Sequence, residues 1–500
     1  MARLSEILSD VVIKDTNLFS DREAGQIRTN SFEVTPGDIF VCVKGASRDG
    51  HDFICVAYER GASMIIAERV TPYLSANPAI PCIIVESTRK ALSHMWNTLC
   101  GRPSDRMIFA AVTGTNGKTS TTYFLREIFR KAGYVTGLVG TVKCLSGDRA
   151  DIIGESGVNS MTTPPPEKLY PELRKMADDG VEIVFLEASS HALSQDRLDP
   201  IRFELSVFTN LTPEHLDYHG DMESYFAAKL KLLTLSKAAL VNADDGWMAK
   251  IPGIADIPTA TYSVKNEADF RAENAYCATK LHGVGYILAE REKLGERRFG
   301  VTCPLDGEFT VYNTLAAVSA ARLFGIAPEV IRKALADCPR IPGRMEFLDV
   351  PERLGFEICL DFAHTPDALK NTLVTLRRRV SPGGRLIVVF GCGGDRDRTK
   401  RPVMGKIASE LADLAVITSD NSRSENPRAI IFDIIREITD RQKCRVVEKR
   451  AAAIAYALGE AKRGDIVLLA GKGHEDYEID SEGKHPFSER RIVSDTLAKL

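Results

Sequence analysis

Short apolar runs alternate with longer amphipathic stretches along the chain, and this pattern predicts strands separated by helices. In the first hundred residues, apolar runs predict strands at 38–43, 63–67 and 80–85 and a helix near 89–99. Two later blocks predict strands at 108–113, 181–187, 205–209 and 239–242, and then at 356–361, 386–390, 414–418 and 466–470. Strands that are each followed by a loop and a helix are typical of parallel sheets, so the sequence predicts an α/β fold.

Two breaks divide this pattern into three predicted domains. GRPSD at 101–105 has the composition of a linker, and a Pro-Gly pair at 342–343 precedes the third block. We therefore expect a small N-terminal α/β domain, a central doubly wound sheet of the P-loop type and a C-terminal Rossmann-like sheet, over residues 1–104, 105–340 and 341–500. Residues 258–312 interrupt the rhythm and predict an antiparallel hairpin layer.

Composition and charge argue against several classes of protein. The 500 residues are 44% hydrophobic without a long apolar stretch, so no membrane insertion is expected. A formal net charge of −3 gives no basic surface for nucleic acid. The N-terminus lacks the basic-then-apolar order of a secretory signal, and the eleven cysteines form no CxxC pair. We expect reduced thiols and a cytoplasmic location.

The segment IFAAVTGTNGKTSTT at 108–122 carries the first candidate chemistry. A buried strand gives way to a glycine-bracketed turn and then to a helix, which would place phosphate at a helix N-terminus with backbone N–H groups facing it. Lys118 would supply positive charge and the Thr119 hydroxyl would bind magnesium. The expected ATP contacts here are Gly114, Thr115, Asn116, Gly117, Lys118, Thr119 and Ser120. The alternative is an ordinary turn between strand and helix, because Val112 replaces the first glycine of the full motif.

Two further polar clusters follow predicted strands. Glu187 ends a buried strand in EASSHAL, where a carboxylate needs a partner or a metal, so it is a candidate magnesium ligand; the alternative is a cap for the next helix. The loop from 209 to 220 contains two histidines, and Asp221 is positioned to cap the helix that follows. Lys229 lies two turns into that helix, where the pattern alone favours a solvated lysine.

Together these motifs resemble those of the Mur ligases, the ATP-dependent amide-bond-forming enzymes of peptidoglycan precursor synthesis. The matching strings are GTNGKTST, EASSHAL, EHLDYHG with its downstream AAK, and DFAHTPDAL, and the similarity runs from residue 25 to 495. The resemblance implies three domains, which hold the UDP group, bind ATP and bring the amino acid. It also implies ATP as co-substrate, Mg²⁺ as cofactor and UDP-N-acetylmuramoyl-L-Ala-D-Glu as acceptor; we expect a monomer.

The resemblance also implies roles for individual residues. Lys118, Lys229 and His364 match catalytic positions, and Lys229 matches a lysine carried as an N-carboxylated side chain. The implied metal ligands are Thr119, Glu187, His215 and Lys229. Asn313, Arg344 and Asp361 match nucleotide contacts. The positions that match contacts to the UDP precursor are Ser31, Thr162, Thr163, Ser189, Gln195 and Arg197.

Two loops of the third block are expected to select the amino acid. They are SDNSRSENPR at 419–428 and AGKGHEDYE at 470–478. Family members that add meso-2,6-diaminopimelate carry DNPR at the first loop. The distal carboxylate of that amino acid requires a guanidinium, and its distal amine requires an acid. The expected contacts are Arg396, Asp420, Asn421, Arg423, Gly471 and Glu475. The alternatives are that Arg423 pairs locally and that the chain adds L-lysine.

Three positions depart from the family pattern. Ser422 replaces the proline of DNPR, which would have stiffened the loop that carries Arg423. Phe32 replaces an arginine next to Ser31, and Thr310 replaces the asparagine that opens F-N-x-x-N. Two other functions compete with a Mur ligase: a folylpolyglutamate synthetase-like ligase, which lacks an N-terminal UDP-binding block, and a regulator that uses the nucleotide as a switch.

Overall fold

The computed structural model describes residues 2–45, 48–147, 161–277, 283–293 and 295–500. The chain separates into two compact units. The first comprises Met1–Ala111, Tyr134–Ser206 and Ala228–Ala238, and the second comprises Val112–Gly133, Val207–Ala227 and Ala239–Leu500. Three elements contribute residues to both units: β6 (Ile108–Thr113), β10 (Leu205–Phe208) and α9 (Met222–Thr234).

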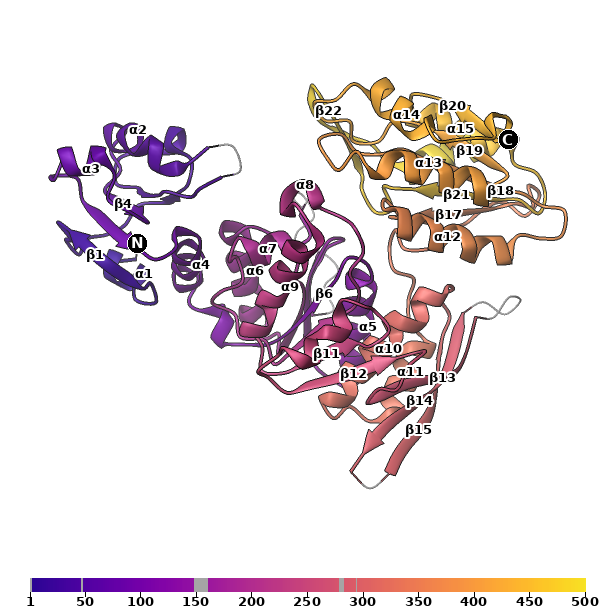
Figure 1. Ribbon diagram of the computed structural model, residues 1–500, viewed down its shortest axis with the longest axis horizontal. Coiled ribbons are helices and arrows are strands. Elements are labelled where there is room, and N and C mark those ends of the chain that lie inside the picture. The colour runs from indigo at the N-terminus through magenta and orange to yellow at the C-terminus, as the bar shows by residue number, and fades with distance from the viewer. Residues whose placement is uncertain (1, 46–47, 148–160, 278–282, 294) are drawn as a thin grey trace. The chain divides into compact units, whose positions relative to one another are not determined.

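The N-terminal part of the first unit is a five-stranded sheet with helices on both faces (Figure 1). Its strands follow the order β1-β5-β4-β3-β2, with bounds Ile13–Asn17, Cys82–Val85, Met64–Ala67, Ile39–Val41 and Ile27–Arg28. All pairs are parallel except β1 with β5. Helices α1 (Leu4–Ile7) and α4 (Thr88–Leu99) pack on one face, and α2 (Ile54–Glu59) and α3 (Pro72–Ala76) lie on the other. The three predicted strands and the helix are confirmed.

The rest of the first unit contains the strand that ends in Glu187. The strands β7 (Thr136–Val139) and β9 (Ile183–Glu187) pair in parallel, and β8 (Cys144–Ser146) pairs antiparallel with β7. The helices α6 (Pro166–Asp178) and α7 (Ser190–Ser194) flank β9 in sequence. All five residues of β9 are buried, which is why the sequence shows a continuous apolar run there.

The second unit begins at Val112, at the end of β6, and its first helix is α5 (Lys118–Lys131). Strands β11 (Ala239–Asn242), β12 (Thr259–Ser263) and β13 (Phe270–Cys277) are parallel neighbours, whereas β14 (Val284–Glu292) and β15 (Gly295–Cys303) continue antiparallel. The helices of this part are α8 (Leu216–His219), α10 (Glu308–Leu323) and α11 (Pro328–Ala336). The predicted antiparallel hairpin layer at 258–312 is confirmed for β13, β14 and β15. It is wrong at both ends, because β12 is parallel and α10 begins within it; residues 278–282 and 294 lie outside the described residues.

The C-terminal part is a six-stranded sheet in the order β16-β17-β21-β18-β19-β20. Its strands are Glu346–Leu348, Glu357–Asp361, Ile466–Ala470, Leu386–Phe390, Leu414–Ile417 and Cys444–Val446, and only β16 is antiparallel. On one face lie α12 (Pro366–Arg379), α13 (Lys400–Leu411) and α14 (Pro427–Ile435), and on the other lie α15 (Arg450–Glu460) and α16 (Glu489–Leu497). A hairpin, β22 (Tyr477–Asp480) and β23 (Gly483–Pro486), follows β21.

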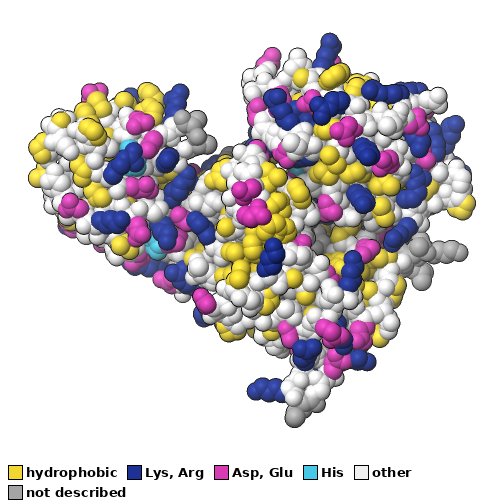
Figure 2. Space-filling view, in the orientation of Figure 1, with side chains coloured by type: hydrophobic (Ala, Val, Ile, Leu, Met, Phe, Trp, Pro, Cys, Tyr) yellow, Lys and Arg dark blue, Asp and Glu magenta, His cyan; other side chains and the backbone are white. Residues whose placement is uncertain are grey.

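The predicted α/β class is confirmed, because parallel strands dominate and helices cover the N- and C-terminal sheets on both faces. Figure 2 shows Lys and Arg side chains intermingled with Asp and Glu side chains over the face in view. Among the helices of the described residues, none is both long and apolar enough to cross a membrane.

Candidate active site

Two glycines shape the turn between β6 and α5. Gly117 is the N-cap of α5 with φ +87°, and a side chain there would collide with the Oδ1 atom of Asn313. Gly114 has φ +147°, and a Cβ atom there would collide with the Thr209 hydroxyl. Both positions therefore require glycine for their backbone angle and for the close approach of another residue. The helix N-terminus that follows is suited to an anion.

The loop is held by Asn210, which sequence reasoning did not single out. The Thr115 N–H donates to the Asn210 carbonyl at 2.8 Å, and the Asn116 N–H donates to Asn210 Oδ1 at 2.9 Å. The expectation that these N–H groups face an anion is corrected for both residues, because they hold the loop instead. Lys118 Nζ donates to the carbonyls of Gly114 and Thr115 at 2.9 and 2.8 Å. These two hydrogen bonds hold the positive charge of Lys118 next to the turn.

Residues beyond 340 reach this loop within the second unit. Arg344 Nη2 donates to the buried Thr119 hydroxyl at 3.0 Å, and its guanidinium lies 4.8 Å from the ring centre of Phe362. Asn116 Nδ2 donates to Asp367 Oδ2 at 3.2 Å. These contacts connect the expected phosphate site with the C-terminal sheet.

The chain turns at Gly343 before it enters that sheet. Gly343 has φ +67°, and a Cβ atom there would collide with the backbone N of His474. Its carbonyl accepts the Phe362 N–H at 2.9 Å, and its own N–H donates to Glu346 at 2.6 Å. The loop after β21 therefore passes directly over this turn.

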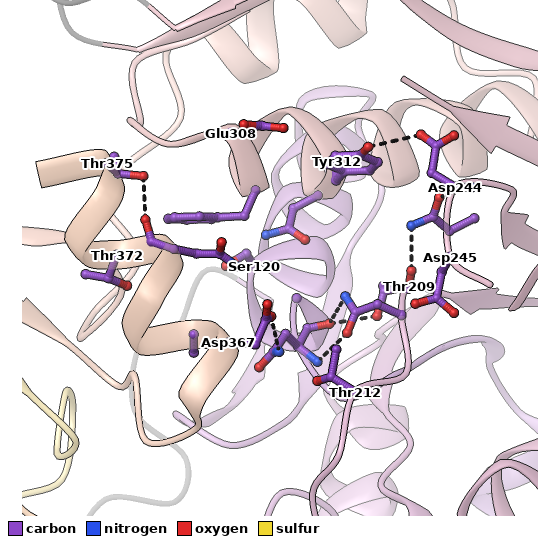
Figure 3. Close-up of a pocket in the computed structure, with 18 of the residues that line it drawn as sticks. Ser120, Thr209, Thr212, Asp244, Asp245, Glu308, Tyr312, Asp367, Thr372 and Thr375 are labelled. Atoms are coloured by element: carbon purple, nitrogen blue, oxygen red, sulfur yellow. Dashed lines mark hydrogen bonds between the residues drawn. The ribbon is translucent and has the colours of Figure 1, made fainter. Parts of the chain in front are cut away.

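A cavity of about 430 Å³ opens beside the glycine turn, and Figure 3 shows part of its lining. The expected nucleotide contacts that line it are Asn116, Gly117, Thr119, Ser120, Asn313, Arg344 and Asp361. The lining residues that sequence reasoning missed include Thr209, Asn210, Asp244, Phe309, Tyr312, Asp367 and Asn371. Tyr312 donates its hydroxyl hydrogen to Asp244 at 3.0 Å. One part of the cavity thus offers aromatic rings and polar groups, and another offers the glycine turn.

The departure at Thr310 has a local explanation. Its hydroxyl donates to the Asp306 carbonyl at 2.7 Å, one turn back along the chain, and the residue is buried. Asn313, one turn further, keeps its expected place in the lining of the cavity. Thr310 therefore stabilises the start of α10, and Asn313 still faces the glycine turn.

Two carboxylates in the cavity wall are shielded from water. Asp361 accepts the Met345 N–H at 2.8 Å and the Ala363 N–H at 2.9 Å, and burial raises its pKa. Burial also raises the pKa of Asp367. Asp361 therefore fixes the turn around Arg344 as well as lining the cavity.

His364 pairs with Glu214, another residue that sequence reasoning did not single out. His364 Nε2 lies 3.0 Å from Glu214 Oε1, and Nδ1 lies 2.7 Å from the Phe362 carbonyl. Each ring nitrogen of His364 therefore lies beside an oxygen that accepts hydrogen bonds, which fixes the orientation of the ring. Burial raises the pKa of Glu214, but the hydrogen bond from His364 and the charge of His215 outweigh it and hold the pKa well below its ordinary value.

In the first unit, Glu187 is fully buried at the end of β9. It accepts the Thr141 N–H at 3.0 Å and the Thr141 hydroxyl at 2.8 Å. Ser189, not Glu187, caps α7, since its Oγ accepts the Ala192 N–H at 3.3 Å. The alternative of Glu187 as a helix cap is therefore wrong.

The expected acceptor contacts gather around the same strand end. Thr163 donates its hydroxyl to the Glu187 carbonyl at 2.6 Å and lies 3.1 Å from the Ser189 hydroxyl. Arg197 donates to the Thr163 carbonyl at 2.6 Å and to Gln195 Oε1 at 2.7 Å. Thr162 joins through its hydroxyl, which lies 3.1 Å from the Thr141 hydroxyl and can donate to it. The structure brings these five expected residues together, and Ser31 lies apart from them in the N-terminal sheet domain.

Several remaining positions are clarified by burial. Lys229 is only 1% exposed, so the alternative of a solvated lysine is wrong. Asp221 caps α9 as predicted, because its Oδ1 accepts the Ser224 N–H at 2.7 Å. Ser31 is buried at the start of a 3₁₀ turn, whereas Phe32 beside it is 62% exposed.

In the part of the chain that the structure describes, no cluster of three or more His, Cys, Asp or Glu side chains is placed to hold a metal ion.

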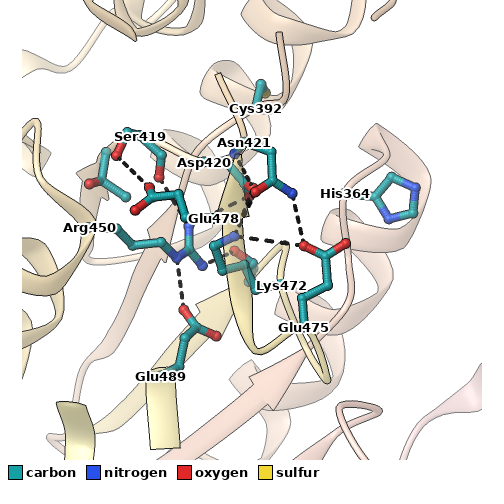
Figure 4. A network of polar contacts seen from close by, with 12 residues as sticks. His364, Cys392, Ser419, Asp420, Asn421, Arg450, Lys472, Glu475, Glu478 and Glu489 are labelled. Carbon is teal, nitrogen blue, oxygen red and sulfur yellow. Dashed lines mark hydrogen bonds and ion pairs between the residues drawn. The ribbon is translucent and has the colours of Figure 1, made fainter. Parts of the chain in front are cut away.

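A second polar site lies at the carboxyl ends of β19 and β21, and Figure 4 shows its network. Asn421 Nδ2 donates to Glu475 Oε2 at 2.9 Å, and Lys472 Nζ donates to Asn421 Oδ1 at 3.0 Å. Burial, followed by the charge of Asp420, raises the pKa of Glu475. Sequence reasoning placed Asn421 and Glu475 here but missed Lys472, although it stands in the quoted AGKGHEDYE string.

Asp420 occupies the charged end of this site. Burial raises its pKa, but the charges of Lys472 and Arg450 outweigh that effect and keep the pKa below its ordinary value. Arg450, also missed from sequence, donates to Glu489 at 2.8 Å. Gly471 has φ +112°, and a Cβ atom there would lie 2.8 Å from Asp420 Oδ2, so this glycine lets the two loops meet.

Arg423 stands beside this network with φ +52°. Its N–H donates to the Ile479 carbonyl at 3.0 Å, and Nη1 donates to the Gly394 carbonyl at 2.9 Å. Burial, together with the nearby charge of Arg396, lowers the pKa of Arg423. Arg396 is exposed on the neighbouring loop. The two guanidinium groups thus lie on adjacent loops, as an anionic ligand would require.

Family models match three stretches of the chain. The model described as "Mur ligase family, catalytic domain" matches residues 24–98, "Mur ligase middle domain" matches 112–321, and "Mur ligase, glutamate ligase domain" matches 343–473. A Clostridium botulinum protein named UDP-N-acetylmuramoyl-L-alanyl-D-glutamate--2,6-diaminopimelate ligase is 39% identical over 480 residues, which is 96% of each chain. A protein of the same name from Aquifex aeolicus is 40% identical over 98% of this chain and 96% of its own.

A solved structure agrees with these matches. It is a UDP-N-acetylmuramoyl-L-alanyl-D-glutamate--2,6-diaminopimelate ligase that is 30% identical to this chain, with a TM-score of 0.63 over 100% of this chain and 99% of its own. The resemblance that the sequence motifs indicated is confirmed. The chain belongs to the Mur ligase family.

Proposed function

We propose that the chain is an ATP-dependent ligase that joins meso-2,6-diaminopimelate to the D-glutamyl residue of UDP-N-acetylmuramoyl-L-Ala-D-Glu. The observation that carries this proposal is the pairing of two sites in one unit, a glycine-turn cavity and a charged site at the ends of β19 and β21. The names of relatives at 39–40% identity support it. They favour it over a folylpolyglutamate synthetase-like ligase and over a nucleotide-operated regulator.

ATP is the proposed occupant of the cavity beside Gly117. The helix N-terminus and Lys118 receive the phosphates, and Asn313, Arg344 and Asp361 contact the rest of the nucleotide. The rings of Phe309 and Tyr312 supply the apolar surface that a base needs. This placement extends the expected contacts with residues that only the cavity reveals.

Mg²⁺ is the proposed cofactor, held by Thr119, Glu187, His215 and a carboxylated Lys229. Three of the four donors fit, because hydroxyl and carboxylate oxygens are the ligands that Mg²⁺ prefers, and carboxylation turns the buried cation of Lys229 into an oxygen donor. His215 would add an imidazole nitrogen. When bound, the ion neutralises charge that develops on the transferred phosphoryl group. Glu187 is oriented for this role by its two hydrogen bonds from Thr141.

The reaction proceeds in two balanced steps. A D-glutamyl carboxylate oxygen forms a bond to the γ-phosphorus of ATP, and ADP leaves. The diaminopimelate amine then attacks the acyl carbon, phosphate leaves with the bonding pair, and the amine loses a proton. Lys118 offsets charge in the first step, and His364, which pairs with Glu214, is the proposed residue near the phosphate from the C-terminal side.

The second site suits an amino acid with two charged heads. Arg423 and Arg396 offer guanidinium groups to the distal carboxylate, and Glu475 with the Gly471 carbonyl receives the distal ammonium. L-Lysine lacks that carboxylate and would leave a half-buried Arg423 without its anion. We therefore favour diaminopimelate over lysine.

The remaining assignments complete the proposal. Thr162, Thr163, Ser189, Gln195 and Arg197 contact the muramoyl peptide, and Ser31 contacts the uridine side. The domain limits are 1–104, 105–340 and 341–500. We place a monomeric enzyme in the cytoplasm; all eleven cysteines, each of them among the described residues, are free thiols.

One assay tests the proposal. Purified protein receives ATP, MgCl₂, the UDP-dipeptide and one amino acid at a time, and phosphate release and product mass are measured. Meso-diaminopimelate should give the extended peptide, with kcat/KM at least about 30-fold above that for L-lysine. No product with any amino acid would overturn the ligase assignment, and equal use of lysine would overturn the specificity.

A further inference from the structure

Lys472 is the centre of the second site. Its side chain is fully buried between the loops that follow β19 and β21. Nζ donates to Asn421 Oδ1 at 3.0 Å and to the Tyr477 carbonyl at 2.8 Å. A buried ammonium is costly unless it is paired and hydrogen-bonded, so this position for a lysine calls for a specific reason.

The ammonium determines which way the Asn421 amide points. Asn421 Oδ1 accepts from Lys472 and also from the Ile479 N–H at 3.0 Å, and neither donor could face an amide nitrogen. The Nδ2 group must therefore face Glu475, whose Oε2 lies 2.9 Å away. Lys472 thus directs the Glu475 carboxylate through Asn421, without a direct short contact.

The charges around Lys472 leave a deficit of positive charge. Nζ lies 3.6 Å from Asp420 Oδ1 and 3.7 Å from Glu475 Oε2. The other buried cation, Arg450, is bonded to Glu489 and lies 3.8 Å from Asp420. Figure 4 also shows Glu478, which attracts Arg450, and the half-buried Arg423 is attracted by Asp420 and Glu475. Four carboxylates therefore face three cations around this site, which leaves a negative charge for an incoming ammonium.

We propose that Lys472 is a positioning residue for the amino-acid substrate. It orients Glu475 through Asn421 and allows Asp420 and Glu475 to remain ionised side by side, so that together they receive the distal ammonium of the diamino acid. The inference rests on the proposed function, because it assigns Lys472 to the amino-acid site of that reaction. It adds a residue to that site that does not itself touch the substrate.

A dependence on pH distinguishes this role from a purely structural one. The titratable and charged groups that face Glu475 are Asp420, Lys472, Tyr477, His364 and Arg423, with the Tyr477 hydroxyl donating to it at 3.3 Å. Burial and Asp420 raise the pKa of Glu475, whereas Lys472 opposes that rise. Loss of the lysine charge should raise this pKa further, so that the variant binds diaminopimelate poorly at low pH and recovers as the pH increases.

The test compares Lys472→Met and Lys472→Gln with a matched control, Lys484→Met. Methionine keeps the length without charge or hydrogen bonds, and glutamine keeps a donor without charge. Lys484 is exposed, and its Nζ lies 3.7 Å from the ring centre of Tyr477, which lies 6.0 Å from Lys472 Nζ, so the control alters another lysine near the same tyrosine. KM for diaminopimelate, KM for ATP and kcat are measured from pH 6 to 9, with the melting temperature as the measure of folding.

For both Lys472 variants, KM for diaminopimelate should rise at least about 30-fold at neutral pH, and KM for ATP should change less than about threefold. The rise should shrink at high pH. If Lys472→Met does not fold, Lys472→Gln decides the question alone. An unchanged KM for diaminopimelate, an equal rise for ATP, or a rise that does not depend on pH would overturn the inference. A wild-type enzyme that forms no product would instead overturn the proposed function.

Discussion

The guanidinium of Arg401 donates two hydrogen bonds to the carboxylate of Glu425, at 2.8 Å to Oε1 and 3.1 Å to Oε2. Glu425 also accepts the Asp395 N–H at 2.6 Å, and Asp395 accepts from the Ser424 hydroxyl at 2.7 Å. These bonds tie the loop of Arg423 to the loop of Arg396. They supply the stiffness that a proline at position 422 would have given.

Removing the buried partner of this pair should destabilise the C-terminal sheet. The Arg401 side chain is 1% exposed, so Arg401→Met leaves a poorly solvated carboxylate and should lower the free energy of unfolding by about 3–5 kcal/mol. Arg398→Met is the matched control, since Arg398 pairs with the same Glu425 at 2.9 Å but is 69% exposed and should cost less than about 1 kcal/mol. Urea unfolding measures both, and equal losses would contradict the argument.

Stability should fall in acid partly through Glu425. The hydrogen bond from Arg401 is the largest cause that holds the pKa of Glu425 below its ordinary value of 4.5. A lowered folded-state pKa means that the unfolded chain takes up the proton first. The stabilisation that ionised Glu425 gives to the folded state is therefore complete above pH 4.5, and it is lost as the pH falls towards the folded-state pKa. The Glu425→Gln variant should lose less stability than the wild type between pH 5 and 3; parallel curves would refute this assignment.

Gly117→Ala should weaken nucleotide binding more than it weakens folding. The added methyl group would occupy the space of Asn313 Oδ1 in a residue with φ +87°, so the turn must move. We expect at least about a tenfold rise in the Kd for ATP, measured by calorimetry. Gly133→Ala at the other end of α5 is the control, with φ +97° and open space around its Cβ position. It should cost about 1 kcal/mol of stability and leave the Kd unchanged.

Arg423→Lys should affect the amino acid more than ATP. Lysine keeps the charge but cannot both donate to the Gly394 carbonyl and bind a carboxylate with two parallel hydrogen bonds. KM for diaminopimelate should rise at least about tenfold in steady-state assays, with KM for ATP little changed. Arg428→Lys, on an exposed arginine that pairs with Glu448, is the control. Equal rises in both KM values would indicate a structural role for Arg423.

Lys229→Ala should abolish turnover, and short carboxylic acids should partly restore it. The proposed carbamate on this buried lysine supplies an oxygen anion, and a small carboxylate can enter the space that alanine leaves. Phosphate release with and without added acetate measures the effect. Lys231→Ala is the control on the same helix, because Lys231 is exposed and pairs with Asp196 at 3.0 Å. Activity of Lys229→Ala without any added acid would exclude the carbamate.

The core strands could be predicted because each is buried on both faces. Strands such as β18 and β21 are continuous apolar runs between polar loops, and periodicity alone locates them. The edge strand β1 was missed because all five of its residues are exposed and only Ile13 among them is apolar. The parallel pairing of β12 with β11 was missed because strand direction depends on partners that sequence spacing does not specify.

The candidate site was only partly predictable for a related reason. Motifs placed Asn313, Arg344 and Asp361 around one cavity, where the structure also has them. They did not reveal that Asn210 holds the glycine turn, because that contact joins residues far apart in sequence. Lys472 was overlooked because a lysine in a polar loop is usually solvated, and only burial shows otherwise.

The turn at Gly343 limits how this enzyme can be recombined with its relatives. Because no side chain fits beneath the backbone of His474, residues 343–345 and the loop at 471–475 form an interlocked unit and must be inherited from the same parent. A chimaera that exchanges the amino-acid module should therefore be joined upstream of residue 343. A junction placed even a few residues later would mismatch the two strands of chain where they cross.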